Sequence, residues 1–136
     1  MRKPITPFAH GVIDYLTVGT VAMAPRLMDF PDEAANACYA LAGIYAGTSM
    51  MTDYPLSVKR AIPFKAHGMA EVAIGALLPA LPFVLGFATN ARARNFFLAL
   101  TAMTALTAAM TDWDKKSEKA ARRRHQRRPR LVKGAA

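Results

Sequence analysis

The chain has 136 residues, enough for one domain, with 53% hydrophobic residues and a formal net charge of +9 at pH 7. Its single cysteine, Cys38, excludes an intramolecular disulfide and a cysteine-based metal motif, and we expect it to be a small packed residue. The charge is concentrated at residues 114–136, where ten Lys and Arg face two acidic residues, so the preceding 113 residues carry a net charge of only +1. The chain is therefore an apolar body followed by a basic tail.

The body contains four apolar segments. Thr6 is a predicted N-cap, with Pro7 at the first helical position. The segments are expected at residues 8–28, 34–52, 64–87 and 95–111. As a helix, the 19 uncharged residues 34–52 span about 28 Å, close to the hydrocarbon thickness of about 30 Å.

These lengths predict an all-α fold, a bundle of four transmembrane helices. The second and fourth segments contain no charged residue, whereas a helix on the surface of a soluble bundle, the alternative fold, needs a polar stripe. With both chain ends on one side, that side holds 15 Lys and Arg and the other holds three, Arg26, Arg92 and Arg94. The positive-inside rule then predicts a multi-pass protein of the cell (inner or plasma) membrane with both termini in the cytoplasm.

The first half of the body recurs in the second half. Among the residues that return after 57 positions are His10, Pro25 and Phe30, which recur as His67, Pro82 and Phe87. After a loop two residues longer, the spacing is 59, so that Tyr54 corresponds to Trp113. The predicted units are a cytoplasmic lead-in (1–7), a membrane hairpin (8–54), a cytoplasmic loop (55–65), a second hairpin (66–113) and a cytoplasmic tail (114–136).

Two hairpins that each cross the membrane twice have the same topology, so we expect a pseudo-two-fold axis along the membrane normal. Because the first segment is echoed later, and Asp14 interrupts its apolar run, we expect it to belong to the mature fold and not to a signal peptide.

Each hairpin carries a proline motif near the outer end of its first segment. The motif reads Ala-Pro-Arg-Leu-Met-Asp-Phe at residues 24–30 and Leu-Pro-Phe-Val-Leu-Gly-Phe at residues 81–87. Both resemble the Ser-Pro-Trp-(Val)-Leu-Gly-Phe signature of SPW-repeat membrane proteins, although the Ser and the Trp are replaced in both copies. The resemblance covers about residues 8–113 and implies a tandem two-helix membrane fold. That family has no established activity, so the resemblance implies no function.

The ionisable groups of the segments fall into one predicted layer near the cytoplasmic boundary. Each repeat opens with a histidine and a carboxylate four residues later, a spacing that places both on one helix face, and each closes with an aspartate. The candidate ligands of this layer are His10, Asp14, Asp53, His67, Glu71 and Asp112. Ionisable groups inside a membrane are costly and usually face the bundle interior.

Four interpretations of this layer stay open. The pairs could hold helices together. Two histidines and four carboxylates are also the ligand set of di-iron and di-manganese carboxylate proteins, and Fe, Mn or Zn would suit them, although the spacing is not Glu-x-x-His. In a third interpretation His10 and His67 are axial ligands of a haem. The fourth is an ion or proton path, or a pocket for a small ligand, that uses the same groups.

The tail is predicted to bind anionic lipid head groups at the cytoplasmic surface. Its arginine-rich stretch contains no interleaved aromatic residue, which disfavours nucleic acid as a partner. The predicted lipid-binding residues are Arg122, Arg123, Arg124, Arg127, Arg128 and Arg130.

The sequence favours a non-enzymatic membrane protein, a structural or interaction module, over a metal-binding redox protein or an ion-conducting protein. It contains no Ser-His-Asp set, phosphate loop or cysteine motif, which argues against the familiar soluble enzyme classes. Gly43-x-x-x-Gly47 predicts close helix packing within the chain ahead of dimerisation, although a homo-oligomer stays open.

Overall fold

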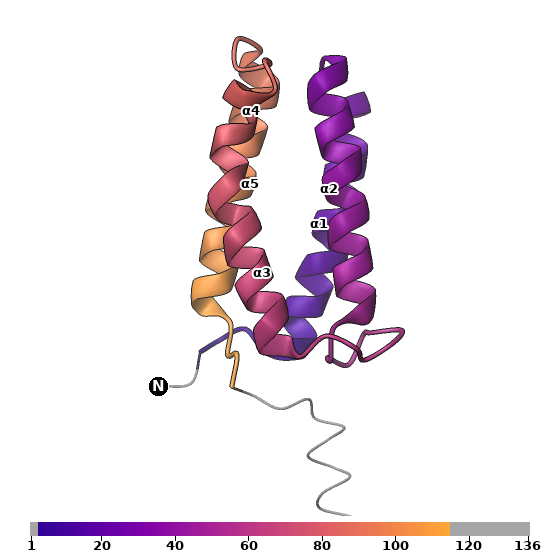
Figure 1. The fold of residues 1–136 in the computed structure, drawn as a ribbon. Helices are drawn as coiled ribbons and strands as arrows, with labels where there is room; N and C mark the ends of the chain where they lie inside the picture. Colours follow the sequence, from indigo (N-terminus) through magenta and orange to yellow (C-terminus); the bar gives the residue numbers. More distant parts are fainter. Residues whose placement is uncertain (1–2, 115–136) are drawn as a thin grey trace, which may run out of the picture.

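The computed structural model describes residues 3–114, which form an all-α bundle with four helical legs (Figure 1). The elements are α1 (Pro7–Leu27), α2 (Asp32–Met51), α3 (Phe64–Leu77), the 3-10 turn η1 (Leu78–Ala80), α4 (Leu81–Val84) and α5 (Ala91–Met110). The third leg is the continuous stretch α3–η1–α4. The predicted helical bundle is confirmed, and the predicted lipid-binding arginines of the tail lie outside the described residues.

Side-chain caps fix where two helices begin. The Thr6 hydroxyl accepts a hydrogen bond from the Ala9 N–H at 3.2 Å, and Pro7 follows at the first position, as predicted. The Asn90 side chain accepts from the Ala93 N–H at 3.0 Å. Because of this cap, α5 begins at residue 91, four residues earlier than the apolar segment suggested.

Prolines interrupt the third leg. Pro79 lacks the N–H that would continue the α3 hydrogen-bond ladder, so the chain tightens into η1 before α4 resumes with Pro82 in its first turn. The first and third legs then leave the bundle through the same backbone turn. Asp29 and its repeat counterpart Gly86 both have positive φ, at 54° and 81°.

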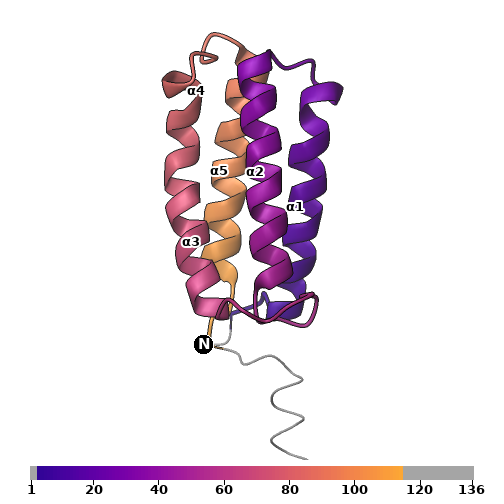
Figure 2. The same ribbon diagram turned by 45° about the vertical axis from the view of Figure 1, so that its right-hand side comes forward.

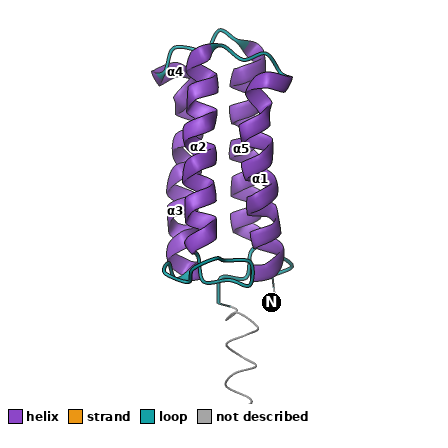
Figure 3. Cartoon of the chain, turned by 90° about the vertical axis from the view of Figure 1, so that its right-hand side faces the viewer, coloured by secondary structure: helices purple, strands orange, loops and turns teal. Residues whose placement is uncertain are grey.

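The two hairpins, α1–α2 and α3–α5, stand side by side with the described chain ends at the same end of the bundle (Figure 1). The turned views place α2 beside α3 and α1 beside α5 (Figures 2 and 3). Consequently α1 and α3, which carry the two predicted His–carboxylate pairs, occupy opposite corners and face the bundle axis.

Two isolated β-bridges join the two repeats at matching positions. Ile5, before the first hairpin, bridges to Thr111 at the end of the second, and Ile62, before the second, bridges to Thr52 at the end of the first. Ile5 and Ile62 are 57 residues apart, and Thr52 and Thr111 are 59 apart, which matches the two repeat spacings. An ion pair between Lys65 and the exposed Asp114 adds a further link, and the hydrogen bond from Lys65 lowers the pKa of that carboxyl.

Beyond the His–carboxylate pairs, the interior of the bundle contains a cluster of buried apolar side chains. Val21, Leu78 and Phe97 are fully buried, and Cys38 is buried as predicted. The prediction that Gly43 and Gly47 pack against another helix of the chain is wrong. A Cβ at either position would meet no atom within 4 Å, because this face of α2 points outward.

One helical stretch of residues 3–114, Phe64–Val84, is long and apolar enough to cross a membrane. The other three legs have 20 or 21 residues, about 30 Å of helix, but Ala, Gly and Thr lower their mean hydropathy. The expected four-span arrangement is therefore not established by hydropathy.

Candidate functional site

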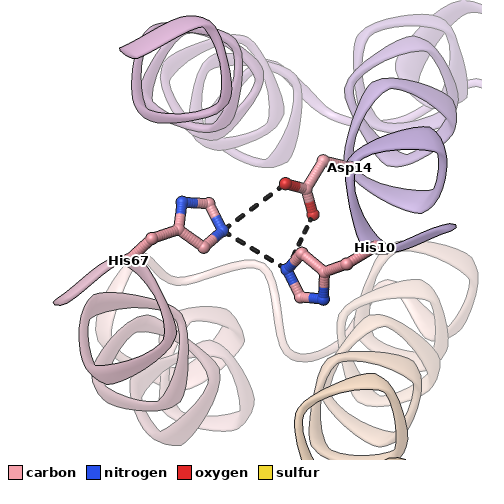
Figure 4. Close-up of side chains that lie close together, drawn as sticks. All are labelled: His10, Asp14 and His67. Atoms are coloured by element: carbon pink, nitrogen blue, oxygen red, sulfur yellow. Dashed lines mark hydrogen bonds and ion pairs between the residues drawn. The ribbon is translucent and has the colours of Figure 1, made fainter. Parts of the chain in front are cut away.

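Four of the six predicted layer residues meet on the bundle axis. His10 and Asp14 come from adjacent turns of α1, and His67 and Glu71 from adjacent turns of α3. All four side chains are buried, with His10 fully inaccessible to solvent. Figure 4 shows the rings of His10 and His67 pointing toward one another, with the Asp14 carboxylate against both. The i, i+4 spacing therefore has the geometric consequence predicted from sequence in both repeats.

The contacts in this cluster are short and mutual. The Nε2 atoms of His10 and His67 are 3.4 Å apart. Asp14 lies against both rings, with Oδ1 at 3.3 Å from His10 Nε2 and Oδ2 at 3.4 Å from His67 Nε2. Glu71 Oε2 is 3.4 Å from His10 Nε2. Within the described residues, one ligand atom each of His10, Asp14 and His67 lie within 4.8 Å of one another.

Two threonines determine the tautomer of the histidines. The Thr52 hydroxyl donates to the Thr48 carbonyl at 2.6 Å, so its oxygen is left to accept the hydrogen bond of 2.8 Å with His67 Nδ1. In the other half, Thr111 donates to a carbonyl at 2.7 Å and lies 2.9 Å from His10 Nδ1.

Both rings therefore carry the proton on Nδ1, an assignment that follows from the hydrogen-bond network. The Nε2 lone pairs are left to face each other on the axis. Each histidine is held by the threonine of the opposite hairpin, so the site also joins the two repeats.

The two carboxylates are not equivalent. Asp14 Oδ2 accepts hydrogen bonds from the Ser49 hydroxyl at 3.2 Å and from the Tyr54 hydroxyl at 3.1 Å. The repeat counterparts of these donors are Ala108 and Trp113, which offer Glu71 no hydroxyl. Glu71 Oε2 is buried and, although close to His10, receives no hydrogen bond.

A small cavity of about 20 Å³ adjoins the cluster between α2 and α3. It is lined by Asp14, Tyr45, Thr48, His67, Ala70, Glu71 and Ile74. The Tyr45 hydroxyl is buried without a hydrogen-bond partner at regular distance and angle, and Thr104 of α5 is the polar side chain next to it. About 10–15 Å³ is enough for one water molecule.

Aromatic rings close the cluster on the side of the chain ends. The Trp113 ring centroid is 4.9 Å from that of His10, and Phe64 is 4.8 Å from Trp113. These rings require a glycine after each histidine. A Cβ on Gly11 would lie 2.8 Å from the Tyr54 ring, and a Cβ on Gly68 would lie 2.7 Å from Trp113. In both repeats the glycine after the histidine thus leaves room for an aromatic ring beside the site.

The other two predicted ligands do not join the cluster. The Asp53 carboxylate is 48% exposed and forms an ion pair with Arg60 at 3.3 Å. Asp112 is half-buried, and its backbone N–H donates to the Ile5 carbonyl. Both lie beyond the C-terminal ends of α2 and α5, which end at Met51 and Met110. The inclusion of Asp53 and Asp112 in the ligand layer is therefore corrected.

The haem interpretation does not fit the cluster. A haem with two axial histidines needs the macrocycle between the two rings. Here the two Nε2 atoms are 3.4 Å apart, and the Asp14 carboxylate contacts both. A planar macrocycle therefore cannot lie between the two rings in this arrangement.

Sequence reasoning did not identify the groups that hold the histidines and Asp14. Thr52 and Thr111 are matched positions of the repeat, so the repeat alignment contained a signal for them. Ser49, which donates to Asp14, has Ala108 as its repeat counterpart and gave none. Neither a protein-family model, nor a curated protein, nor a solved structure matches the chain.

Proposed function

We propose that this chain is an integral membrane protein that binds one divalent transition-metal ion between its two repeats. His10 Nε2, His67 Nε2 and the Asp14 carboxylate are the ligands, and Glu71 supplies the second negative charge. The observation that carries the proposal is the pair of unprotonated Nε2 atoms, fixed by Thr52 and Thr111, that face each other at 3.4 Å.

The distances suit a small metal ion. A tetrahedral site with metal–ligand bonds of about 2.0–2.1 Å has ligand–ligand edges of about 3.3–3.4 Å. The Nε2 atoms of His10 and His67 are 3.4 Å apart, which matches such an edge. Asp14 approaches the two rings with different oxygens, Oδ1 at 3.3 Å from His10 and Oδ2 at 3.4 Å from His67. Metal-binding histidines usually donate their other ring N–H to an outer acceptor, and here the Thr111 and Thr52 hydroxyls accept from Nδ1–H of His10 and His67. Imidazole and carboxylate ligands suit Fe²⁺, Mn²⁺ or Zn²⁺.

The charges balance when an ion is present. Two neutral imidazoles, two carboxylates and one divalent cation give a net charge of zero in an interior that solvates charge poorly. Without a cation, two lone pairs and two carboxylates converge in the same space, and their repulsion opposes the packing. A purely structural role would require protons in place of the ion.

The surface of the bundle supports membrane insertion of all four legs. Leu16 on α1 is 66% exposed, Met69 on α3 is 75% exposed, and Leu106 on α5 is 60% exposed. Residues 8–25, 34–52, 66–87 and 95–111 contain two charged residues, Asp14 and Glu71, and both are buried. A soluble bundle would place charged residues on the outer faces of these helices.

The basic residues favour cytoplasmic termini. Counted along the sequence, 15 Lys and Arg come before α1, between α2 and the end of the first turn of α3, or after α5, against three in the stretches that end the first leg and begin the last. The basic tail would then lie against the anionic lipid surface of the cytoplasmic leaflet. A reporter fused after residue 136 tests this orientation, and activity of the reporter on the external side would refute it. The resemblance to SPW-repeat proteins remains a prediction about the fold.

The metal proposal is tested on protein purified in detergent without chelators. We expect about one Fe, Mn or Zn per chain by elemental analysis, or stoichiometric uptake of added Co²⁺ with a visible absorption band. Asp14→Asn should abolish this binding. Asp53→Asn makes the same change on an exposed aspartate outside the cluster and should leave the metal content unchanged.

Two results decide against the proposal. If neither resident metal nor added Fe²⁺, Mn²⁺, Co²⁺ or Zn²⁺ binds to the wild type, the cluster is a structural contact. If His10→Ala with His67→Ala retains the metal of the wild type, the ion is bound elsewhere in the chain.

A further inference from the structure

We infer that the metal ion of the proposed site carries an exchangeable water molecule in the cavity between Glu71 and Tyr45. The inference rests on the proposed function and defines the kind of site. A metal with three protein ligands and one solvent ligand is open to small ligands such as water, hydroxide or a small anion, whereas a site closed by four protein ligands is structural.

Two unsatisfied polar atoms point to this water. Among the buried polar side-chain atoms of residues 3–114, two have no hydrogen-bond partner at regular distance and angle: Tyr45 Oη and Glu71 Oε2. Both residues line the same cavity of about 20 Å³. Buried polar groups are rarely left unpaired, and a water molecule there would donate to Glu71 and accept from Tyr45.

The cavity also has the right position. Asp14 and His67, two of the three proposed ligands, form part of its wall. Glu71 approaches His10 at 3.4 Å but does not belong to the group of three ligand atoms within 4.8 Å of one another. A water molecule can therefore complete the coordination of the ion while Glu71 accepts its hydrogen bond.

The repeat explains why the cavity lies between α2 and α3. Ala70 lines it, and the repeat-related position in α1 is Ile13, whose side chain is larger by three carbon atoms. Tyr45 has Thr104 as its counterpart in the second repeat. The two halves thus share ligands but differ in the residues that would accommodate a solvent ligand.

The same difference supplies the test variant. Ala70→Ile copies the residue of the other repeat and should fill the cavity without changing a ligand. Ala70 and Ala73 are both exposed residues of α3, but Ala73 does not line this cavity, so Ala73→Ile serves as the control. Ala70→Val is the smaller substitution if Ala70→Ile does not fold.

The experiment uses detergent-purified full-length protein loaded with Co²⁺, whose content is measured first. Transfer into water enriched in oxygen-17 should broaden the low-temperature electron paramagnetic resonance signal of the wild type and of Ala73→Ile. In Ala70→Ile the Co²⁺ content should be unchanged and the broadening lost.

The outcomes separate the two proposals. Absence of Co²⁺ and of every other metal from the wild type refutes the metal site itself, and the water ligand with it. Stoichiometric Co²⁺ without oxygen-17 broadening in the wild type leaves the metal site standing and overturns the open position. Broadening that persists fully in Ala70→Ile overturns the placement of the water in this cavity.

Discussion

Gly68→Ala tests the packing that closes the cluster. The added Cβ would lie 2.7–2.8 Å from three atoms of the Trp113 ring, so the ring must move by more than half an ångström to reach ordinary contact. The ring is held by the hydrogen bond from Trp113 Nε1 to the Ala108 carbonyl at 2.9 Å and by its contacts with Phe64 and His10. The Trp113 ring is therefore not free to move aside, and the added methyl group must disturb the packing around it.

The expected magnitude follows from two opposing effects. Overpacking costs about 1–3 kcal/mol, and loss of the tryptophan hydrogen bond costs about 1 kcal/mol. Against this, Ala is favoured over Gly inside a helix by about 1 kcal/mol. Gly43→Ala makes the same substitution on α2, where a Cβ meets no atom within 4 Å, and retains only the favourable effect. The two variants should thus differ in unfolding free energy by about 2–4 kcal/mol.

The chain contains a single tryptophan, so its fluorescence reports directly on the displacement. We expect Gly68→Ala to shift the emission of the folded protein and to unfold at lower temperature or denaturant concentration in detergent. Gly43→Ala should keep the wild-type emission and equal or exceed the wild-type stability. Equal stability and identical emission spectra of the two variants would refute the packing of Trp113 against Gly68.

Three further substitutions test single hydrogen bonds. Thr52→Val removes the acceptor of His67 Nδ1–H and should weaken metal binding in a chelator competition by about 10- to 100-fold, whereas Thr101→Val, whose hydroxyl donates to a carbonyl in its own helix, should not change it. Tyr54→Phe removes a donor to the Asp14 carboxylate and should lower the unfolding free energy by about 1.5–3 kcal/mol in a denaturant titration; no change would refute that bond. Asn90→Ala removes the cap of α5 and should cost about 1 kcal/mol in the same titration, while the exposed Asn36→Ala should be nearly neutral, and equal effects would contradict the cap.

Local rules predicted most of the helical architecture. The N-cap at Thr6 and the four apolar segments depend on neighbouring residues and on helix geometry, so they can be predicted along the chain. Apolar length predicted four membrane spans, whereas one helical stretch of the described residues meets the hydropathy requirement. The other three contain many small residues, whose contribution to hydropathy is weak although they occupy the length of a span.

The predicted packing of Gly43 and Gly47 against another helix of the chain was wrong because small residues alone do not determine the rotation of a helix. Small residues at Gly43 and Gly47 permit close approach of a helix but do not determine which face of the helix turns inward. The larger residues of α2, among them Leu41 and Tyr45, occupy the inner face and determine its rotation.

The sequence by itself determined the two-fold repeat and the pairing of each histidine with a carboxylate on one helix face, because a spacing of four residues has a fixed meaning on a helix. The tertiary structure decided which pairs meet. By placing α1 and α3 at opposite corners, it brought His10 and His67 to the axis, and it left Asp53 and Asp112 outside, beyond the ends of α2 and α5. It also decided the tautomers, since Thr52 and Thr111 reach the histidines across the boundary between the hairpins. Contacts between residues so far apart in sequence depend on how the helices pack, and helix periodicity alone does not contain that information.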